Sequence, residues 1–98
     1  MRQISGVKTE VTKEIIDLAR KYNIKKLIVF GSRARNDYKE RSDIDLAVSG
    51  GDILRFTLDL DERVQTLLMF DVVNLDGAVQ DELRQAIAEE GIIIYEKI

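Results

Sequence analysis

The chain has 98 residues, of which 45% are hydrophobic and 34% are charged, and these proportions are typical of one folded domain over residues 1–98. It contains no cysteine and no histidine, which excludes disulfides, thiolate or imidazole metal sites, and Ser-His-Asp or cysteine nucleophiles. The net charge of −3 argues against general binding to the nucleic-acid backbone, so direct nucleic-acid binding is not expected.

The first half of the chain predicts a helix followed by two strands. Apolar residues recur at helical spacing from Thr9 to Tyr22, which predicts the first helix. An apolar run at residues 26–30 predicts a buried strand that Gly31 ends. The polar segment 32–42 is expected to be irregular, with one short helical turn beginning at Ser32, and residues 44–48 predict a second strand.

The second half predicts two further helix and strand pairs. Gly50, Gly51 and Asp52 end the second strand, and a long helix is expected over residues 52–68. A third strand is expected over residues 70–75 and a turn at residues 76–77. Gly91 is expected to cap the last helix, and a fourth strand follows over residues 92–95. One face of that last helix is expected to carry Val79, Leu83, Ala86, Ile87 and Glu90. The buried stripe of the long helix is expected to contain Phe56, Leu60, Val64, Leu67 and Leu68.

These elements predict an α/β (α+β) fold with a mixed sheet of about four strands and helices packed against it. No apolar run approaches the ~20 residues of a transmembrane helix, and residues 1–6 lack the apolar core of a signal peptide. We therefore expect a cytoplasmic protein that does not bind membranes.

Three carboxylates are the candidate metal-binding and catalytic residues. Asp43 and Asp45 stand two positions apart at the second predicted strand, so their side chains are expected on the same face, with Cα atoms roughly 6.5 Å apart. In a chain without soft ligands, such a pair suits Mg²⁺, which binds one or two carboxylates together with water and phosphate oxygens. Asp71 interrupts the third strand, and it is expected either to help hold a second metal ion, to accept a proton, or to pair with a nearby arginine.

The segment after the first strand is a candidate phosphate-binding turn. Gly31 allows a phosphate to approach the backbone, and Ser32 adds a hydroxyl and the free N–H groups of a helical turn. Arg33 and Arg35 add positive charge that can compensate triphosphate oxygens. The alternative for both arginines is exposure to solvent or pairing with acidic residues such as Asp37 and Glu40. No Gly-Lys-Ser/Thr sequence is present, which excludes a P-loop.

The sequence resembles the minimal nucleotidyltransferases of the DNA polymerase beta superfamily. The similarity is carried by Gly31-Ser32, ten intervening residues and Asp43-x-Asp45, and it extends from about Val11 to Glu96. The motifs Ser32-Arg33-Ala34-Arg35, Ser42-Asp43-Ile44-Asp45-Leu46 and Gly91-Ile92-Ile93-Ile94-Tyr95-Glu96 contribute to it. One departure is Asn36, where many members have glycine; asparagine is the best substitute in a left-handed conformation.

The resemblance implies a reaction and a partner. Asp43 and Asp45 would coordinate Mg²⁺, Asp71 would be the third active-site carboxylate, and Gly31 and Ser32 would bind the β- and γ-phosphates of ATP. AMP would be transferred to a hydroxyl, such as that of a tyrosine, of a HEPN-domain protein to which this chain would be the antitoxin. The alternative is a catalytically weak or inactive binding module that neutralises a partner by masking its active site. The oligomeric state, homo-oligomer or hetero-complex, stays open.

Overall fold

The computed structural model describes residues 2–97. Helices and strands alternate along the chain in the predicted order. The elements are α1 (Thr9–Lys21), β1 (Lys26–Phe30), α2 (Ser32–Arg35), β2 (Ile44–Ser49), α3 (Ile53–Arg63), β3 (Phe70–Asn74), α4 (Asp81–Glu90) and β4 (Ile92–Glu96).

The strands form one mixed sheet in the order β3-β2-β1-β4. Strand β1 pairs antiparallel with both β2 and β4, whereas β2 and β3 are parallel. The parallel pair requires a crossover connection, which α3 provides. The predicted α+β class with a mixed sheet of about four strands is confirmed.

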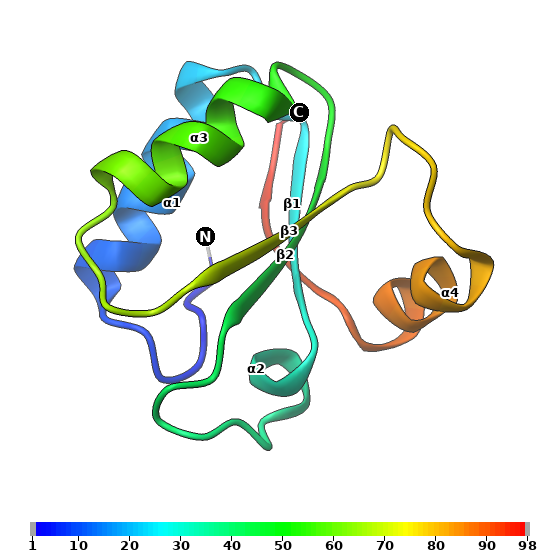
Figure 1. Cartoon of the computed structure of the whole chain (residues 1–98), viewed down its shortest axis with the longest axis horizontal. Coiled ribbons are helices and arrows are strands. Elements are labelled where there is room, and N and C mark those ends of the chain that lie inside the picture. Colours follow the sequence, from blue (N-terminus) through cyan, green and yellow to red (C-terminus); the bar gives the residue numbers. More distant parts are fainter. Residues whose placement is uncertain (1, 98) are drawn as a thin grey trace.

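Helices α1 and α3 lie side by side against one face of the sheet, and α4 lies on the opposite side (Figure 1). The main core forms between the sheet and the first two of these helices. Alternate residues of β2 point into it, and Ile44, Leu46 and Val48 are each fully buried because of this alternation. From the helices, Ile15, Phe56 and Leu60 complete the centre of the core.

The other face of the sheet is only partly covered. Helix α4 contributes one buried residue, Ile87, and then reaches β4 through Gly91. A Cβ atom on Gly91 would lie 2.5 Å from Ile28 Cγ2 and would also collide with the carbonyl oxygen of Ile87. Glycine therefore allows the end of α4 to pack directly on β1. None of the helices within residues 2–97 is both long and apolar enough to cross a membrane.

Two predicted helix boundaries were wrong. Helix α3 ends at Arg63, not at residue 68, because Val64 adopts an extended conformation and the chain turns toward β3. Leu67 is consequently 99% exposed and does not belong to the buried stripe. Helix α4 begins at Asp81, so Val79 precedes it. Gly91 does end α4 as predicted, in an extended rather than a left-handed conformation.

Candidate active site

The three candidate carboxylates lie on neighbouring strands. Asp43 and Asp45 flank Ile44, whose side chain is buried in the core, so both acids project toward the opposite face of the sheet. In the parallel pairing of β2 with β3, Asp45 and Asp71 are direct partners. Residues paired in this way project to the same face, and the sheet therefore brings all three acids to one region.

The turn after β1 meets this region at Asp45. Phe30, the last residue of β1, is the antiparallel partner of Asp45, and Gly31 follows with φ 73° and ψ −152°. This conformation is accessible essentially only to glycine. A Cβ atom at Gly31 would collide with the Asp45 carboxylate. The small-residue turn and the acidic pair therefore converge, as the sequence predicted, and Ser32 begins the one-turn helix α2 beside them.

The environment of Asp45 disfavours its charged form. Burial raises the pKa of the Asp45 carboxyl, and the negative charges of Asp71 and Asp43 raise it further. The positive charges of Arg35 and Arg33 lower this pKa and compensate only in part. The site consequently carries excess negative charge, which a cation would neutralise.

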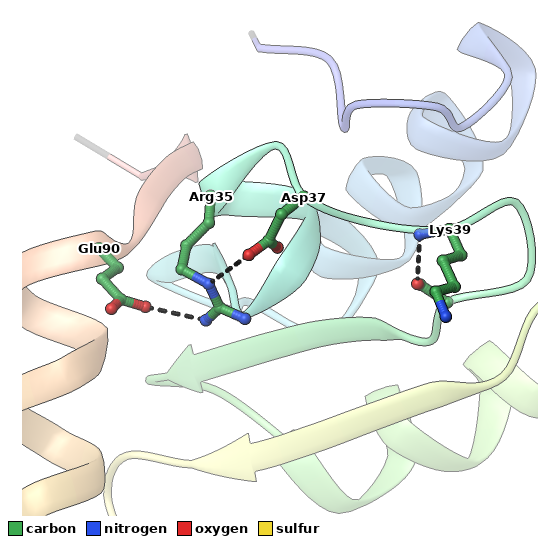
Figure 2. Close-up of polar contacts among 5 residues, drawn as sticks. Arg35, Asp37, Lys39 and Glu90 are labelled. Atoms are coloured by element: carbon green, nitrogen blue, oxygen red, sulfur yellow. Dashed lines mark hydrogen bonds and ion pairs between the residues drawn. The ribbon is translucent and has the colours of Figure 1, made fainter.

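Arg35 lies at the rim of the site and is held by two carboxylates. Its Nε is 3.3 Å from Asp37 Oδ2 and its Nη1 is 3.1 Å from Glu90 Oε2 at the end of α4. Figure 2 shows the guanidinium of Arg35 between these two acids. Both ion pairs raise the pKa of Arg35. The side chain is half-exposed, so phosphate oxygens could replace either acid as its partner.

Arg33 is placed very differently, although it is only two positions away. It is 1% exposed, and its guanidinium donates to the backbone carbonyl oxygens of Ser5, Glu40 and Ser42. The ring of Tyr38 lies over the guanidinium, 4.8 Å from Cζ to the ring centroid. A bond from Arg33 to a phosphate would require the side chain to leave these partners.

The segment between α2 and β2 folds as a compact loop. Asn36 caps α2 in the left-handed conformation (φ 66°) expected for a glycine substitute. Farther along, the backbone N–H of Lys39 donates to Ser42 Oγ at 2.8 Å.

The sequence did not predict that Glu90 lies next to Arg35, because 55 positions separate the two residues and no local pattern signals the contact.

Comparison with known proteins identifies the family. Residues 13–98 match the family model described as "Polymerase beta, Nucleotidyltransferase". The chain belongs to this nucleotidyltransferase family. It is 34% identical over 97 residues to a Methanocaldococcus jannaschii protein named "Putative protein adenylyltransferase", covering 95% of this chain and 98% of the relative.

Two solved structures have the same fold as this nucleotidyltransferase. A "putative minimal nucleotidyltransferase" aligns with a TM-score of 0.63 and 29% identity, covering 83% of this chain and 86% of the other. A toxin–antitoxin structure with AMP-PNP aligns with a TM-score of 0.70 over 88% of this chain and 73% of the other, at 24% identity. The minimal-nucleotidyltransferase resemblance is confirmed.

The acidic residues of this nucleotidyltransferase could hold a cation together with the phosphate oxygens of a nucleotide. Within residues 2–97, no group of three or more acidic side chains is arranged to hold a metal ion by itself. Mg²⁺ uses one or two carboxylates together with phosphate oxygens and water, so the pair Asp43 and Asp45 fits its requirements. A bound cation would offset the negative charge that raises the pKa of the Asp45 carboxyl.

Proposed function

We propose that this nucleotidyltransferase is a Mg²⁺-dependent protein adenylyltransferase that transfers AMP from ATP to a hydroxyl of a partner protein in the cytoplasm. The reaction forms a bond between the acceptor oxygen and the α-phosphorus of ATP. It breaks the bond from that phosphorus to the bridging oxygen, and pyrophosphate leaves. The relative named as a protein adenylyltransferase supports this substrate class.

Asp43 and Asp45 would hold the metal ion, and Gly31, Ser32 and Arg35 would bind the triphosphate. When bound, Mg²⁺ neutralises charge that develops on the phosphate oxygens. The absence of a side chain at Gly31 lets the Asp45 carboxylate lie directly against the turn, and a phosphate bound by the turn would therefore lie close to the metal ligand. The Arg35 guanidinium would exchange Asp37 or Glu90 for phosphate oxygens.

Asp71 would accept the proton of the acceptor hydroxyl. Its side chain is exposed, and it lies opposite Asp45 across the parallel strand pair. A carboxylate there can be reached by a hydroxyl that approaches from solvent, as an acceptor on another protein must. Asp71 would take the proton of the hydroxyl while the hydroxyl oxygen bonds to the α-phosphorus.

The observation that carries the proposal is the meeting of three segments at Asp45. This residue pairs with Asp71 on one side and with Phe30 on the other, and its carboxylate touches the space beside Gly31. Acids for a cation, a turn for phosphate and a proton acceptor are thus within one small region. A fold used only for masking would not require this convergence.

We further propose that the acceptor is a tyrosine of a HEPN-domain partner toxin. The support is the family resemblance, together with a toxin–antitoxin structure of the same fold. One face of the sheet is only partly covered by α4, and a partner bound at this face would shield the nucleotide from water. In this arrangement the antitoxin inactivates its partner by modifying it.

The decisive experiment follows the label of ATP radiolabelled on its α-phosphate. The purified protein, Mg²⁺ and lysate from its own source are expected to give a labelled protein band. Asp43→Asn combined with Asp45→Asn should abolish the labelling, because both proposed metal ligands lose their charge. Asp61→Asn, an exposed residue of α3, is the matched control and should label as the wild type does.

ATP labelled on the γ-phosphate separates nucleotide transfer from phosphorylation. It is expected to leave the protein band unlabelled, since the γ-phosphate departs in pyrophosphate. Equal labelling by the double variant would remove Asp43 and Asp45 from the mechanism. A double variant that still neutralises the partner in cells, without any transfer by the wild type, would replace the proposal by the masking alternative.

A further inference from the structure

The buried guanidinium of Arg33 has no carboxylate partner among the ion pairs within residues 2–97. Burying a charged group is costly unless hydrogen bonds replace its hydration. Here the replacement comes from backbone carbonyls on two segments, the N-terminal residue Ser5 and the loop residues Glu40 and Ser42. The guanidinium therefore ties these two segments to α2.

The carbonyl that accepts two hydrogen bonds from Arg33 lies next to a proposed metal ligand. Arg33 donates twice to the Ser42 carbonyl, from Nη2 at 2.8 Å and from Nε at 3.2 Å. The residue after Ser42 is Asp43, and beyond it the N–H of Ile44 donates to the Met69 carbonyl at 2.9 Å. The backbone of Asp43 is thus fixed on both sides, by Arg33 before it and by the sheet after it.

Tyr38 and Gly6 keep the guanidinium in this position. The Tyr38 ring stacks on Arg33, and Gly6 lies against both, since a Cβ atom on Gly6 would fall 2.8 Å from Arg33 Nη1 and collide with the ring. Gly6 also has φ +73°, which other residues rarely adopt. To turn outward toward a nucleotide, Arg33 would have to leave both the Tyr38 ring and its carbonyl partners.

We propose that Arg33 is a positioning residue that sets the place of Asp43 by holding the loop of residues 37–43, and that of the two arginines only Arg35 binds the phosphates. The proposal rests on the proposed function for the role of Asp43. Lysine cannot replace Arg33, because a single ammonium group cannot donate to the Ser42 carbonyl from two nitrogens while it also reaches Ser5. The two arginines of one helical turn therefore have different roles, positioning for Arg33 and phosphate binding for Arg35.

The test compares Arg33→Lys with Arg55→Lys, an exposed arginine of α3 that serves as the matched control. In the protein without nucleotide, Arg33→Lys should speed hydrogen exchange of the amides of residues 37–43 by about tenfold or more, while the amides of β1 keep their wild-type rates. Uniformly faster exchange throughout the chain would indicate general destabilisation and would overturn the proposal. Tyr38→Leu, a milder change at the same contact, should have the same local effect if Arg33→Lys does not fold.

The second readout is the Mg²⁺ concentration that gives half-maximal transfer at saturating ATP. It should rise by about 10-fold or more in Arg33→Lys, as expected when the support of a metal ligand is lost, and stay unchanged in Arg55→Lys. Arg35→Gln should instead raise the KM for ATP without changing exchange in the loop. Unchanged exchange and an unchanged Mg²⁺ requirement in both Arg33→Lys and Tyr38→Leu would overturn the proposal. If the wild type transfers nothing, the exchange experiment alone decides for or against the positioning, and the proposed function fails separately.

Discussion

Asp45 is a residue whose charged form opposes folding and which we propose as a metal ligand. Its carboxyl has a raised pKa because it is partly buried and faces two other acids. A carboxyl with a raised pKa in the folded state favours folding when protonated, and this contribution is lost as the pH rises through the folded-state pKa. At neutral pH the ionised group therefore destabilises the folded chain, and the proposed cation would relieve this effect.

We expect Asp45→Asn to stabilise the protein at pH 7 and to abolish transfer. The amide removes repulsion from Asp43 and Asp71, and the melting temperature should rise by about 2–4 °C, since 1 kcal/mol moves it by roughly 4–8 °C in a domain of this size. Thermal unfolding followed by circular dichroism measures the change. The gain should vanish near pH 3, where carboxylates are mostly protonated. A lower melting temperature at pH 7 would contradict the electrostatic account.

At the same scale, the sequence predicted the acids and the glycine turn but could not distinguish the two arginines. The alternation of strand residues placed Asp43 and Asp45 on one face, and Gly31 marked the end of β1, because both signals are local. Arg33 and Arg35 belong to the same short motif and have the same chemistry. Their different surroundings depend on Ser5 and Glu90, which are distant in sequence and are brought near only by tertiary packing.

Among the elements, the strands were predicted more accurately than the ends of the helices. Apolar runs bounded by glycine or polar residues gave β1 its observed bounds and the other strands theirs to within one residue. The apolar spacing of α3 continues to Leu68, but the parallel pairing of β3 with β2 requires the chain to turn back earlier. The turn is stabilised by Thr66 Oγ1, which accepts a hydrogen bond from the Leu68 amide. Apolar periodicity is a local signal and does not predict such long-range requirements.

The junction between α4 and β4 provides a prediction at this scale. Gly91→Ala should destabilise the protein by about 1–3 kcal/mol, because the added methyl group would press on Ile28 and on the carbonyl of Ile87. Gly77→Ala is the control, since its nearest neighbour would be 3.6 Å away, an ordinary contact. Urea unfolding of both variants measures the difference. Equal free energies of unfolding would show that α4 can shift away from β1 at no cost.

For the whole molecule, stability depends on the core that α1 and α3 form with one face of the sheet. Phe56→Ala should cost about 3–5 kcal/mol, because Phe56 is completely buried there. A domain of this size has a total stability of roughly 5–15 kcal/mol, so a large share would be lost. Leu67→Ala, at a residue that is 99% exposed, should change it by less than about 0.5 kcal/mol. Urea unfolding monitored by circular dichroism compares the free energies of unfolding of the two variants. Similar losses of stability would contradict a main core located between the sheet and helices α1 and α3.

The parallel pairing of β2 with β3 also affects the order in which the contacts of the site form during synthesis and folding. Asp45 can face Asp71 only after the crossover through α3 has closed, whereas the antiparallel contact between β1 and β2 needs a shorter loop. A ribosome-bound chain that has emerged only as far as β2 would already contain the glycine turn and two of the acids, yet lack Asp71, the proposed proton acceptor. The proposed site is therefore complete only after β3 has been synthesised and has paired with β2 beside Asp45.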